Sequence, residues 1–390
     1  MTPLHPLEVP SGAAVLQVLP ALRAALDGGP AVLPYAVGAP PPATPDQGAH
    51  LPEGLALVVG TSGSTGSPKL AMLTRDALVA SATATHERLG GPGQWLLPMP
   101  AHHIAGLQVL VRSLVAGTEP VPVDLSGGFT PAAFASAARR LEGGRRYTSI
   151  VPTQLVRLLA DEAGIEALRR FEAVLLGGAA SPPALLARAA AAGVRVTTTY
   201  GMSETAGGCV YDGRPLGCSR VRVDADGRLH LGGATLAEGY LGRPDLTEAA
   251  FTTDTDGTRW FATDDVGHRD EHGRWHVDGR LDDLVNTGGL KVAPRLVEEA
   301  LTERLPAVAE CAVVGVADPE WGEVVAAALV LVDGADGATA PTLADVRDAL
   351  REVLPAHALP RRVAVVDALP LRGPGKPDRA ALRALLSRSS

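Results

Sequence analysis

The sequence predicts an α/β protein with a large N-terminal domain and a small C-terminal domain. Short runs rich in Val and Leu alternate with helix-like segments in the first half of the chain, which is typical of a parallel sheet joined by crossover helices. From residue 209 to about residue 279, short strand candidates are separated by Gly and Asp. After Arg280, helices and strands are mixed. We therefore expect parallel or mixed sheets flanked by helices, a small β-rich subdomain, and an α+β C-terminal domain.

The expected elements of the first domain alternate regularly. A strand over 55–60 precedes a helix from about Arg75, and a strand over 149–152 precedes a helix over 153–164. A strand over 172–178 precedes a helix over 182–193, and another strand covers 194–201. Gly or Pro falls at each strand end, where open α/β sheets place their ligand-binding loops.

The second half contains a β-rich part and a separate α+β part. The β-rich part includes the strand candidates GRLHLGG (227–233) and GRWHVDG (273–279). The α+β part is expected to have helices over 295–305 and 343–354 and strands over 311–318, 324–333 and 361–367. It is long enough for a domain of its own. We place the boundary near Asp282, which predicts domains 1–281 and 282–390.

Composition and charge restrict the class of partner. Of the 390 residues, 46% are hydrophobic and 20% are charged, so the chain can bury a large core. The formal net charge is -8 and the arginines are scattered, which argues against nucleic acid and favours small molecules. No basic residue precedes Arg23, and no apolar run reaches the roughly 18 residues of a membrane span. We expect a cytoplasmic protein without a membrane span; the assembly state stays open, with a homodimer as one option.

A glycine-rich loop with hydroxyl side chains follows the strand over 55–60. Its donors come from Thr61, Ser62, Gly63, Ser64, Thr65, Gly66 and Lys69. The glycines allow successive backbone N–H groups to converge on an anion, and the lysine adds a cation. The loop does not match the Walker A pattern, because Lys69 follows Pro68 and precedes Leu70. On these residues alone, a phosphate-binding loop and an ordinary turn both stay open.

Further motifs follow the loop in a fixed order. They are PAHHIAG (100–106), LLGGAA (175–180), TTYGMSET (198–205), GRLHLGG with GY (227–240), WFATDDVG (260–267), GRLDDLVNTGGLKVAP (279–294) and PLRGPGK (370–376). Together with TSGSTGSPK, they resemble the acyl-adenylate-forming superfamily, which includes acyl-CoA synthetases, luciferases and the adenylation domains of peptide synthetases. The resemblance implies that ATP activates a carboxylic acid as an acyl-adenylate.

The resemblance also implies a nucleotide site. The loop would grip the β- and γ-phosphates of ATP, Glu204 would bind Mg²⁺, and Thr205 would contact the α-phosphate. Asp265 would accept the ribose hydroxyls, with Arg280 beside it. The remaining residues implied for the ATP site are Gly178, Ala179, Tyr200, which would flank adenine, and Gly201. Asp264 departs from the common Thr-Gly-Asp of the superfamily and adds a second acid next to Asp265.

The resemblance assigns the catalytic lysine to the C-terminal domain. Lys376 would bridge the reacting carboxylate and the α-phosphate, where an ammonium offsets charge in the transition state. The small domain would therefore be mobile, with Asp282 at its hinge. In a second orientation, Gly288 and Gly289 would line the tunnel for coenzyme A. His103 would lie near the acyl carboxylate; a core histidine is the alternative.

The acid substrate is indicated by a buried charge and a closer resemblance. Arg112 stands in the apolar stretch GLQVLVRSLVAG, and a buried arginine needs an anion. That anion is either an internal carboxylate or a second carboxylate of the substrate. The short chain, HHIAGLQVLVR (102–112) and YGMSETAGGCVYDGRPL (200–216) resemble actinobacterial o-succinylbenzoate–CoA ligases of menaquinone biosynthesis, with Thr153 in the acid pocket.

Two other functions stay open on the sequence. One is a stand-alone adenylation enzyme that loads another aryl or fatty acid onto coenzyme A or a carrier protein. The other is a nucleotide-binding sensor without turnover.

Overall fold

The computed structural model describes residues 4–42, 51–61, 69–332, 340–370 and 377–388. It has the predicted α/β architecture, and its chain forms two compact units. The first unit comprises Met1–Arg222, His230–Thr263 and Arg269–Trp275, and the second comprises Val223–Leu229, Asp264–His268 and His276–Ser390. The domain boundary at residues 281 and 282 stays a prediction.

A five-stranded sheet in the first unit carries the predicted phosphate loop. Its order is β1 (Leu4–Val9), β2 (Ala31–Ala36), β3 (Leu55–Gly60), β4 (Leu70–Thr74) and β14 (Gly239–Tyr240). The strands β1 to β3 are parallel, whereas β4 runs antiparallel to β3 and β14 runs antiparallel to β4. The predicted strand over 55–60 is confirmed, and its continuous apolar run suits a strand buried on both faces.

A seven-stranded sheet forms the second layer of this unit. Its order is β11 (Arg214–Pro215), β10 (Gly207–Tyr211), β9 (Val196–Met202), β8 (Ala173–Leu176), β7 (Arg146–Ile150), β5 (Gln94–Leu97) and β6 (Val121–Pro122). The five strands from β9 to β6 in this order are parallel, and β7, β8 and β9 correspond to the predicted strands over 149–152, 172–178 and 194–201. Because β10 extends this sheet, the expected start of the β-rich part at residue 209 is wrong.

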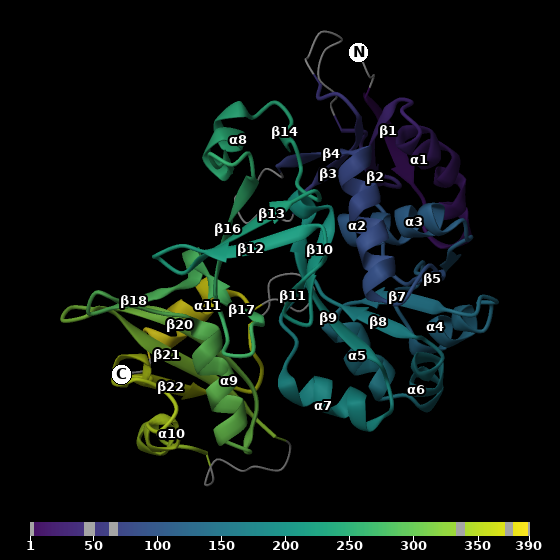
Figure 1. Cartoon of the computed structure of the whole chain (residues 1–390). Helices are drawn as coiled ribbons and strands as arrows, with labels where there is room; N and C mark the ends of the chain where they lie inside the picture. Colours follow the sequence, from purple (N-terminus) through teal and green to yellow (C-terminus); the bar gives the residue numbers. More distant parts are fainter. Residues whose placement is uncertain (1–3, 43–50, 62–68, 333–339, 371–376, 389–390) are drawn as a thin grey trace. The chain divides into compact units, whose positions relative to one another are not determined.

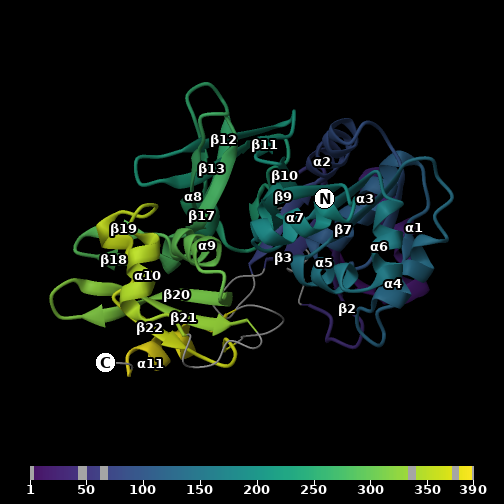
Figure 2. The same cartoon turned by 90° about the horizontal axis from the view of Figure 1, so that it is seen from below.

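Two helices pack side by side between these sheets (Figures 1 and 2). They are α2 (Arg75–Arg88), which contacts β3, β4 and β10, and α3 (Ile104–Ala116), which contacts β5, β7 and β10. The Thr74 side chain caps α2 by accepting from Ala77 N at 3.2 Å. Gly117 ends α3 with a φ of 67°, which glycine adopts without strain. Helix α1 (Leu19–Leu26), after a 3-10 segment over Gly12–Val18, also contributes buried side chains to this core.

Four helices pack on the seven-stranded sheet through a second buried cluster that includes Phe134, Leu155 and Leu168. They are α4 (Pro131–Ala138), α5 (Pro152–Leu159), α6 (Glu162–Arg169) and α7 (Pro183–Ala191). The single helix that we expect over 153–164 is wrong, because it is two helices. Asp161 caps α6 by accepting from Gly164 N at 2.7 Å and so starts a new helix at that point.

The third sheet, which supplies residues to both units, is the predicted β-rich part. Its order is β12 (Ser219–Val223), β13 (Arg228–Gly233), β16 (Arg259–Arg269) and β15 (Phe251–Thr253), with β17 (Trp275–Arg280) on β16. Helix α8 (Pro244–Ala250) precedes β15.

The fourth sheet lies in the second unit. Its order is β19 (Leu290–Val292), β18 (Val285–Thr287), β21 (Gly322–Leu331) and β20 (Val308–Asp318), with β22 (Arg362–Val365) on β21. Among its described residues, this unit has the helices α9 (Pro294–Arg304), α10 (Leu343–Leu350) and α11 (Arg379–Leu386). The predicted α+β pattern is confirmed here.

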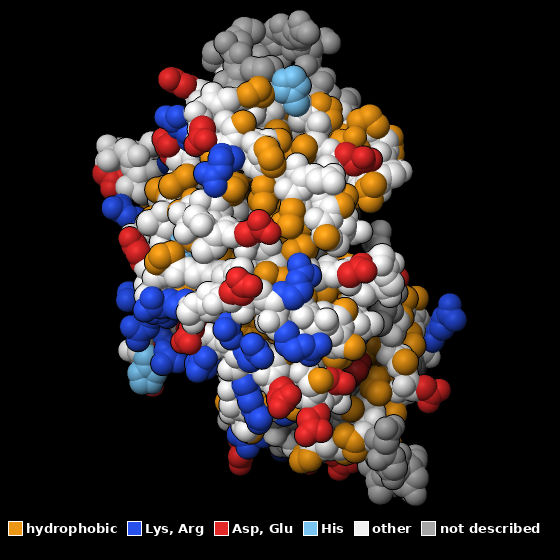
Figure 3. Space-filling model, turned by 90° about the vertical axis from the view of Figure 1, so that its right-hand side faces the viewer, with side chains coloured by type: hydrophobic (Ala, Val, Ile, Leu, Met, Phe, Trp, Pro, Cys, Tyr) orange, Lys and Arg blue, Asp and Glu red, His pale blue; other side chains and the backbone are white. Residues whose placement is uncertain are grey.

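Surface charge and helix character bear on the expected partners. On the face that Figure 3 draws, acidic and basic side chains are interspersed with hydrophobic ones. Within the described ranges, no helix is both long enough and apolar enough to cross a membrane.

Candidate active site

The ends of β3 and β4 form the base of the predicted phosphate loop. Thr61 N donates to Lys69 O at 2.8 Å, which continues the ladder that joins Gly60 to Leu70. The loop residues Ser62, Gly63, Ser64, Thr65 and Gly66 lie outside the described residues. The structure thus brings Thr61 and Lys69 together where the loop leaves and rejoins the sheet.

Glu204 lies beside this loop base. It belongs to the 3-10 turn η2 (Ser203–Thr205), which directly follows β9. The Ser203 Oγ donates to Gly60 O at 3.2 Å, so the turn is attached to the end of β3. Glu204 is 7% exposed, and its Oε1 accepts from the Tyr240 hydroxyl at 2.8 Å. A buried carboxylate therefore stands next to the point where the phosphate loop begins.

Thr205 closes the same turn. Its Oγ1 accepts from Met202 N at 3.0 Å and lies 2.7 Å from Gly207 O, to which it can donate. The side chain is fully buried. These contacts give the hydroxyl a role in holding η2, and its contact with the α-phosphate stays a prediction.

The predicted adenine-site residues lie at the ends of two neighbouring parallel strands. Gly178 and Ala179 follow β8, and Tyr200 and Gly201 lie in β9. Gly178 has a φ of 80°, in the region that glycine favours. At Gly201, a Cβ would collide with the carbonyl oxygen of Gly207, because β10 passes close by. The structure therefore brings these four residues to one edge of the sheet.

His103 and Thr153 lie at the same edge. His103 precedes α3 in the loop after β5, and Thr153 is in the first turn of α5 after β7. Strands β5 and β7 are parallel neighbours, and the Gln154 Nε2 donates to Pro98 O at 2.8 Å, which joins the two loops. Desolvation lowers the pKa of His103, so the neutral ring is favoured near neutral pH.

Arg112 is buried between α3, β5 and β10. Its Nη2 donates to the Tyr211 hydroxyl at 3.2 Å, and its guanidinium lies 5.0 Å from the centre of the Trp95 ring. Its Nε has no hydrogen-bond partner within the described ranges. At 3% exposure, the guanidinium can meet a substrate carboxylate only if the surrounding core opens. Its assignment to the acid stays a prediction.

The predicted ribose-binding residues lie in the second unit. Arg280 contacts three carboxylates: Nη1 is 4.0 Å from Asp265 Oδ1, Nη2 is 3.5 Å from Asp264 Oδ2, and Nε is 2.9 Å from Asp282 Oδ1. The Asp265 side chain is 14% exposed, whereas that of Asp264 is 58% exposed. The more enclosed Asp265 is thus the one held beside Arg280 in a polar cluster.

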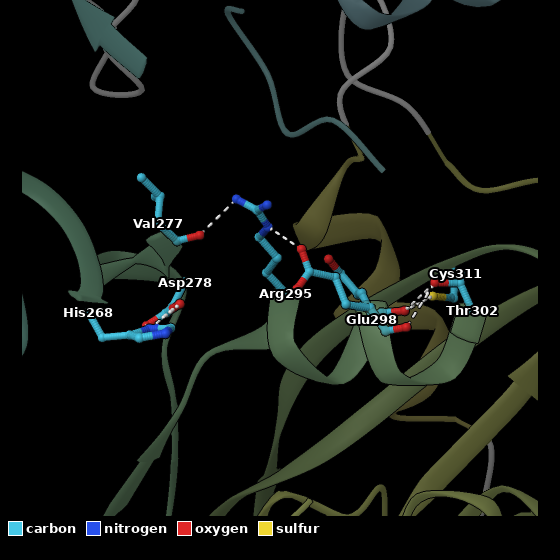
Figure 4. Close-up of polar contacts among 8 residues, drawn as sticks. His268, Val277, Asp278, Arg295, Glu298, Thr302 and Cys311 are labelled. Atoms are coloured by element: carbon cyan, nitrogen blue, oxygen red, sulfur yellow. Dashed lines mark hydrogen bonds and ion pairs between the residues drawn. The ribbon is translucent and has the colours of Figure 1, made fainter. Parts of the chain in front are cut away.

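Polar contacts brace the strands that carry this cluster (Figure 4). The Arg295 Nη1 donates to Val277 O at 2.7 Å, which attaches α9 to β17. His268 Nδ1 lies 2.8 Å from Asp278 Oδ2, which joins β16 to β17. Asp265 in β16 and Arg280 in β17 therefore lie on two paired strands that these contacts hold together.

The turn predicted to enter the coenzyme A tunnel lies between β18 and β19. Gly288 and Gly289 have φ values of 59° and 81°, which glycine tolerates. A Cβ on Gly288 would meet the Trp321 ring at 2.7 Å. The predicted hinge residue, Asp282, lies in the turn η3 (Leu281–Asp283), and Lys376 lies outside the described residues.

The family of this chain follows from comparison with models of known protein families. Residues 11–241 match the model of the AMP-binding enzyme family, and residues 296–376 match that of the AMP-binding enzyme C-terminal domain. The chain belongs to the AMP-binding enzyme family. The predicted membership of the acyl-adenylate-forming superfamily is therefore confirmed.

Relatives of this chain include proteins named as 2-succinylbenzoate–CoA ligases. The chain is 48% identical to a probable 2-succinylbenzoate–CoA ligase of Mycobacterium tuberculosis over 97% of each chain. It is 32% identical to a 2-succinylbenzoate–CoA ligase of Listeria monocytogenes, over 84% of this chain and 69% of the relative. A solved structure of wild-type Escherichia coli MenE with a bound analogue of OSB-AMS has a TM-score of 0.74 at 25% identity, covering 100% of this chain and 89% of that one. These likenesses extend over both predicted domains.

Tyr240 contacts the predicted site residue Glu204, and the sequence does not indicate this contact. The motif GY contains the tyrosine, but nothing in the local sequence points to a carboxylate 36 residues earlier.

Proposed function

We propose that this AMP-binding enzyme is an ATP-dependent acid–CoA ligase that acts on o-succinylbenzoate in menaquinone biosynthesis. The carboxylate attacks the α-phosphorus of ATP, which forms the acyl-adenylate and releases pyrophosphate. The thiol of coenzyme A then attacks the acyl carbon, which forms the thioester and releases AMP. The observation that carries the proposal is the 48% identity, over nearly the full length, to a probable 2-succinylbenzoate–CoA ligase.

The first unit supplies donors for the triphosphate. Loop residues 61–69 would hold the β- and γ-phosphates, since backbone N–H groups, hydroxyls and Lys69 all favour an anion. Mg²⁺ fits Glu204, because this cation prefers oxygen ligands and binds through one or two carboxylates together with substrate phosphates. When bound, it would neutralise phosphate charge. Glu204 stands beside the loop base, as this role requires.

The second unit would complete the site in two orientations. Asp265, paired with Arg280, offers two oxygens to the ribose diol. Lys376 would place a positive charge between the carboxylate and the α-phosphate during the first step. Rotation at Asp282 would then bring Gly288 and Gly289 to the path of the thiol. Such alternation is a domain closure with few hinge residues.

The acid would bind at the sheet edge that His103 and Thr153 share. The neutral His103 ring can donate its N–H to the reacting carboxylate, which only accepts. The Arg112 guanidinium would hold the second carboxylate of the substrate. We further propose a cytoplasmic location, where ATP and coenzyme A are available, and a homodimer, which sedimentation would test.

The test of this function is a substrate panel. Purified protein with ATP, Mg²⁺, coenzyme A and o-succinylbenzoate should yield AMP, pyrophosphate and a thioester. Turnover of another aryl or fatty acid, with none of o-succinylbenzoate, would reject the substrate. Dependence on a carrier protein instead of coenzyme A would favour the stand-alone adenylation enzyme. If the protein exchanges no labelled pyrophosphate into ATP with any carboxylate, the result would favour a nucleotide-binding sensor without turnover.

A further inference from the structure

Tyr240 joins two residues that the nucleotide site uses. Its hydroxyl donates to Glu204 Oε1 at 2.8 Å, and the Lys69 Nζ lies 5.2 Å from the centre of its ring. Tyr240 is 3% exposed and Glu204 is 7% exposed, so the hydrogen bond is shielded from water. One buried side chain thus connects the carboxylate of η2 with the lysine at the end of the phosphate loop.

The backbone of Tyr240 is held against the strand that follows this loop. Strand β14 pairs with β4, where Tyr240 lies opposite Ala71. The backbone N–H groups at positions 238 and 241 each donate to a carbonyl of β4 at 2.8 Å. The N–H group at position 237 donates to Glu204 O, also at 2.8 Å. Residues 237–241 are therefore attached to both structures whose side chains Tyr240 contacts.

The ring has little freedom to turn away. Phe251 packs edge-on against it, with 5.8 Å between the ring centres. Tyr240 N donates to the Thr247 Oγ1 at 2.9 Å, and a Cβ on Gly239 would collide with the Thr247 side chain. Because position 239 is a glycine, α8 can approach this closely. The close packing of α8 fixes the direction in which the tyrosine points.

We propose that Tyr240 is a positioning residue for the nucleotide complex. Its hydroxyl orients the Glu204 carboxylate for Mg²⁺, as partners of metal-binding carboxylates generally do. Its ring face attracts the Lys69 ammonium and keeps it beside that carboxylate. The inference rests on the proposed function, because it assigns Tyr240 a part in binding the ATP–metal complex.

The test separates the hydroxyl from the ring. Mn²⁺, which prefers the same oxygen ligands as Mg²⁺, can be followed by electron paramagnetic resonance in the presence of ATP. We expect Tyr240→Phe to weaken Mn²⁺ binding about tenfold, a typical loss for an outer-shell partner of a metal ligand. The Mg²⁺ concentration for half-maximal pyrophosphate exchange should rise in parallel, with a nearly unchanged rate at saturating Mg²⁺. Tyr240→Leu, which also removes the ring, should weaken ATP binding even at saturating metal.

Tyr147→Phe is the matched control. That hydroxyl is also enclosed, but its one hydrogen lies between Leu89 O at 3.0 Å and Gly91 O at 2.9 Å, after the end of α2. We expect the control to lower thermal stability and to leave Mn²⁺ binding as in the wild type.

Several results would overturn the inference. Mn²⁺ binding by folded Tyr240→Phe within twofold of the wild type would do so, as would an equal loss in Tyr147→Phe. If Tyr240→Phe does not fold, Phe251→Leu is the second variant, because it removes the ring that packs edge-on against Tyr240 and leaves the hydroxyl in place. Mn²⁺ binding should then weaken severalfold, and binding equal to that of the wild type would refute the role. Because Mn²⁺ binding needs no turnover, a wild type that binds metal with ATP but exchanges no pyrophosphate would instead refute the ligase function.

Discussion

Replacing Tyr211 by phenylalanine tests how the protein tolerates a buried cation. The Tyr211 hydroxyl accepts from Arg112 Nη2 at 3.2 Å and lies 3.0 Å from Thr85 Oγ1. Burial lowers the pKa of Arg112, and the interaction with Tyr211 opposes that shift. The substitution removes this oxygen and leaves the guanidinium with the Trp95 ring but without its hydroxyl partner.

The magnitude follows from the charge on the donor. A hydrogen bond to a charged group contributes about 1.5–3 kcal/mol, so we expect Tyr211→Phe to lower the free energy of unfolding by about 2–3 kcal/mol. For a unit of this size, the melting temperature should fall by roughly 4–12 °C. Arg112→Met should reduce this loss when it is combined with Tyr211→Phe, since a buried charge replaced by an apolar side chain of similar volume is often tolerated.

The assay is urea unfolding of both single variants and the double variant. Tyr147→Phe is the control, because it removes a buried hydroxyl that does not contact Arg112. If Tyr211→Phe costs less than about 0.5 kcal/mol, or costs the same with Met at position 112, the reasoning about the buried cation is wrong. The same proteins test the acid-binding prediction. A KM that rises in Arg112→Met for o-succinylbenzoate but not for a monoacid, with unchanged stability, would place the guanidinium at the substrate instead.

Three further outcomes are expected. Lys376→Ala should abolish acyl-AMP formation while presynthesised acyl-AMP is still converted to the thioester, because the charge acts where the carboxylate meets the α-phosphate; equal loss of both steps would make the lysine structural. Burial and then the charge of Arg112 lower the pKa of His86 to about 4, and its Nε2 accepts from the Trp95 Nε1 at 3.2 Å. The folded state therefore favours the neutral ring, and the free energy of unfolding should fall, on the order of 3 kcal/mol in total, as the pH drops from about 6.5 to about 4. His86→Gln should flatten this slope in urea titrations, and an unchanged slope would assign the effect to other groups. Gly239→Ala should displace β14 through the Thr247 side chain and raise the Mg²⁺ requirement of pyrophosphate exchange; half-saturation equal to that of the wild type would contradict this.

Local patterns in the sequence were enough for most of the fold. The apolar run over 55–60 predicted β3, and the alternation of strands and helices up to residue 201 predicted the parallel sheet. The helix over 153–164 was wrong because a single aspartate, Asp161, caps a new helix. The extent of the β-rich part was wrong because the pairing of β10 with β9 depends on neighbours in space and not on its own residues.

Such patterns predicted only part of the candidate site. Motif order predicted which residues contact ATP, and those roles stay predictions. The structure places Glu204 beside the loop base and Asp265 beside Arg280. The partner of Arg112 is a tyrosine hydroxyl 99 residues away, an answer that neither a charge pattern nor helical periodicity could supply.

By itself, the sequence determined the family of this protein, because the order of its motifs marks an AMP-binding enzyme. It also predicted a glycine-rich anion-binding loop and a carboxylate for a hard cation. Those properties depend on residue type and on neighbours along the chain. The tertiary structure alone decided which side chains support them, including Tyr240 between Glu204 and Lys69. Such contacts depend on directions and separations of a few ångströms, which arise only when distant strands pack together.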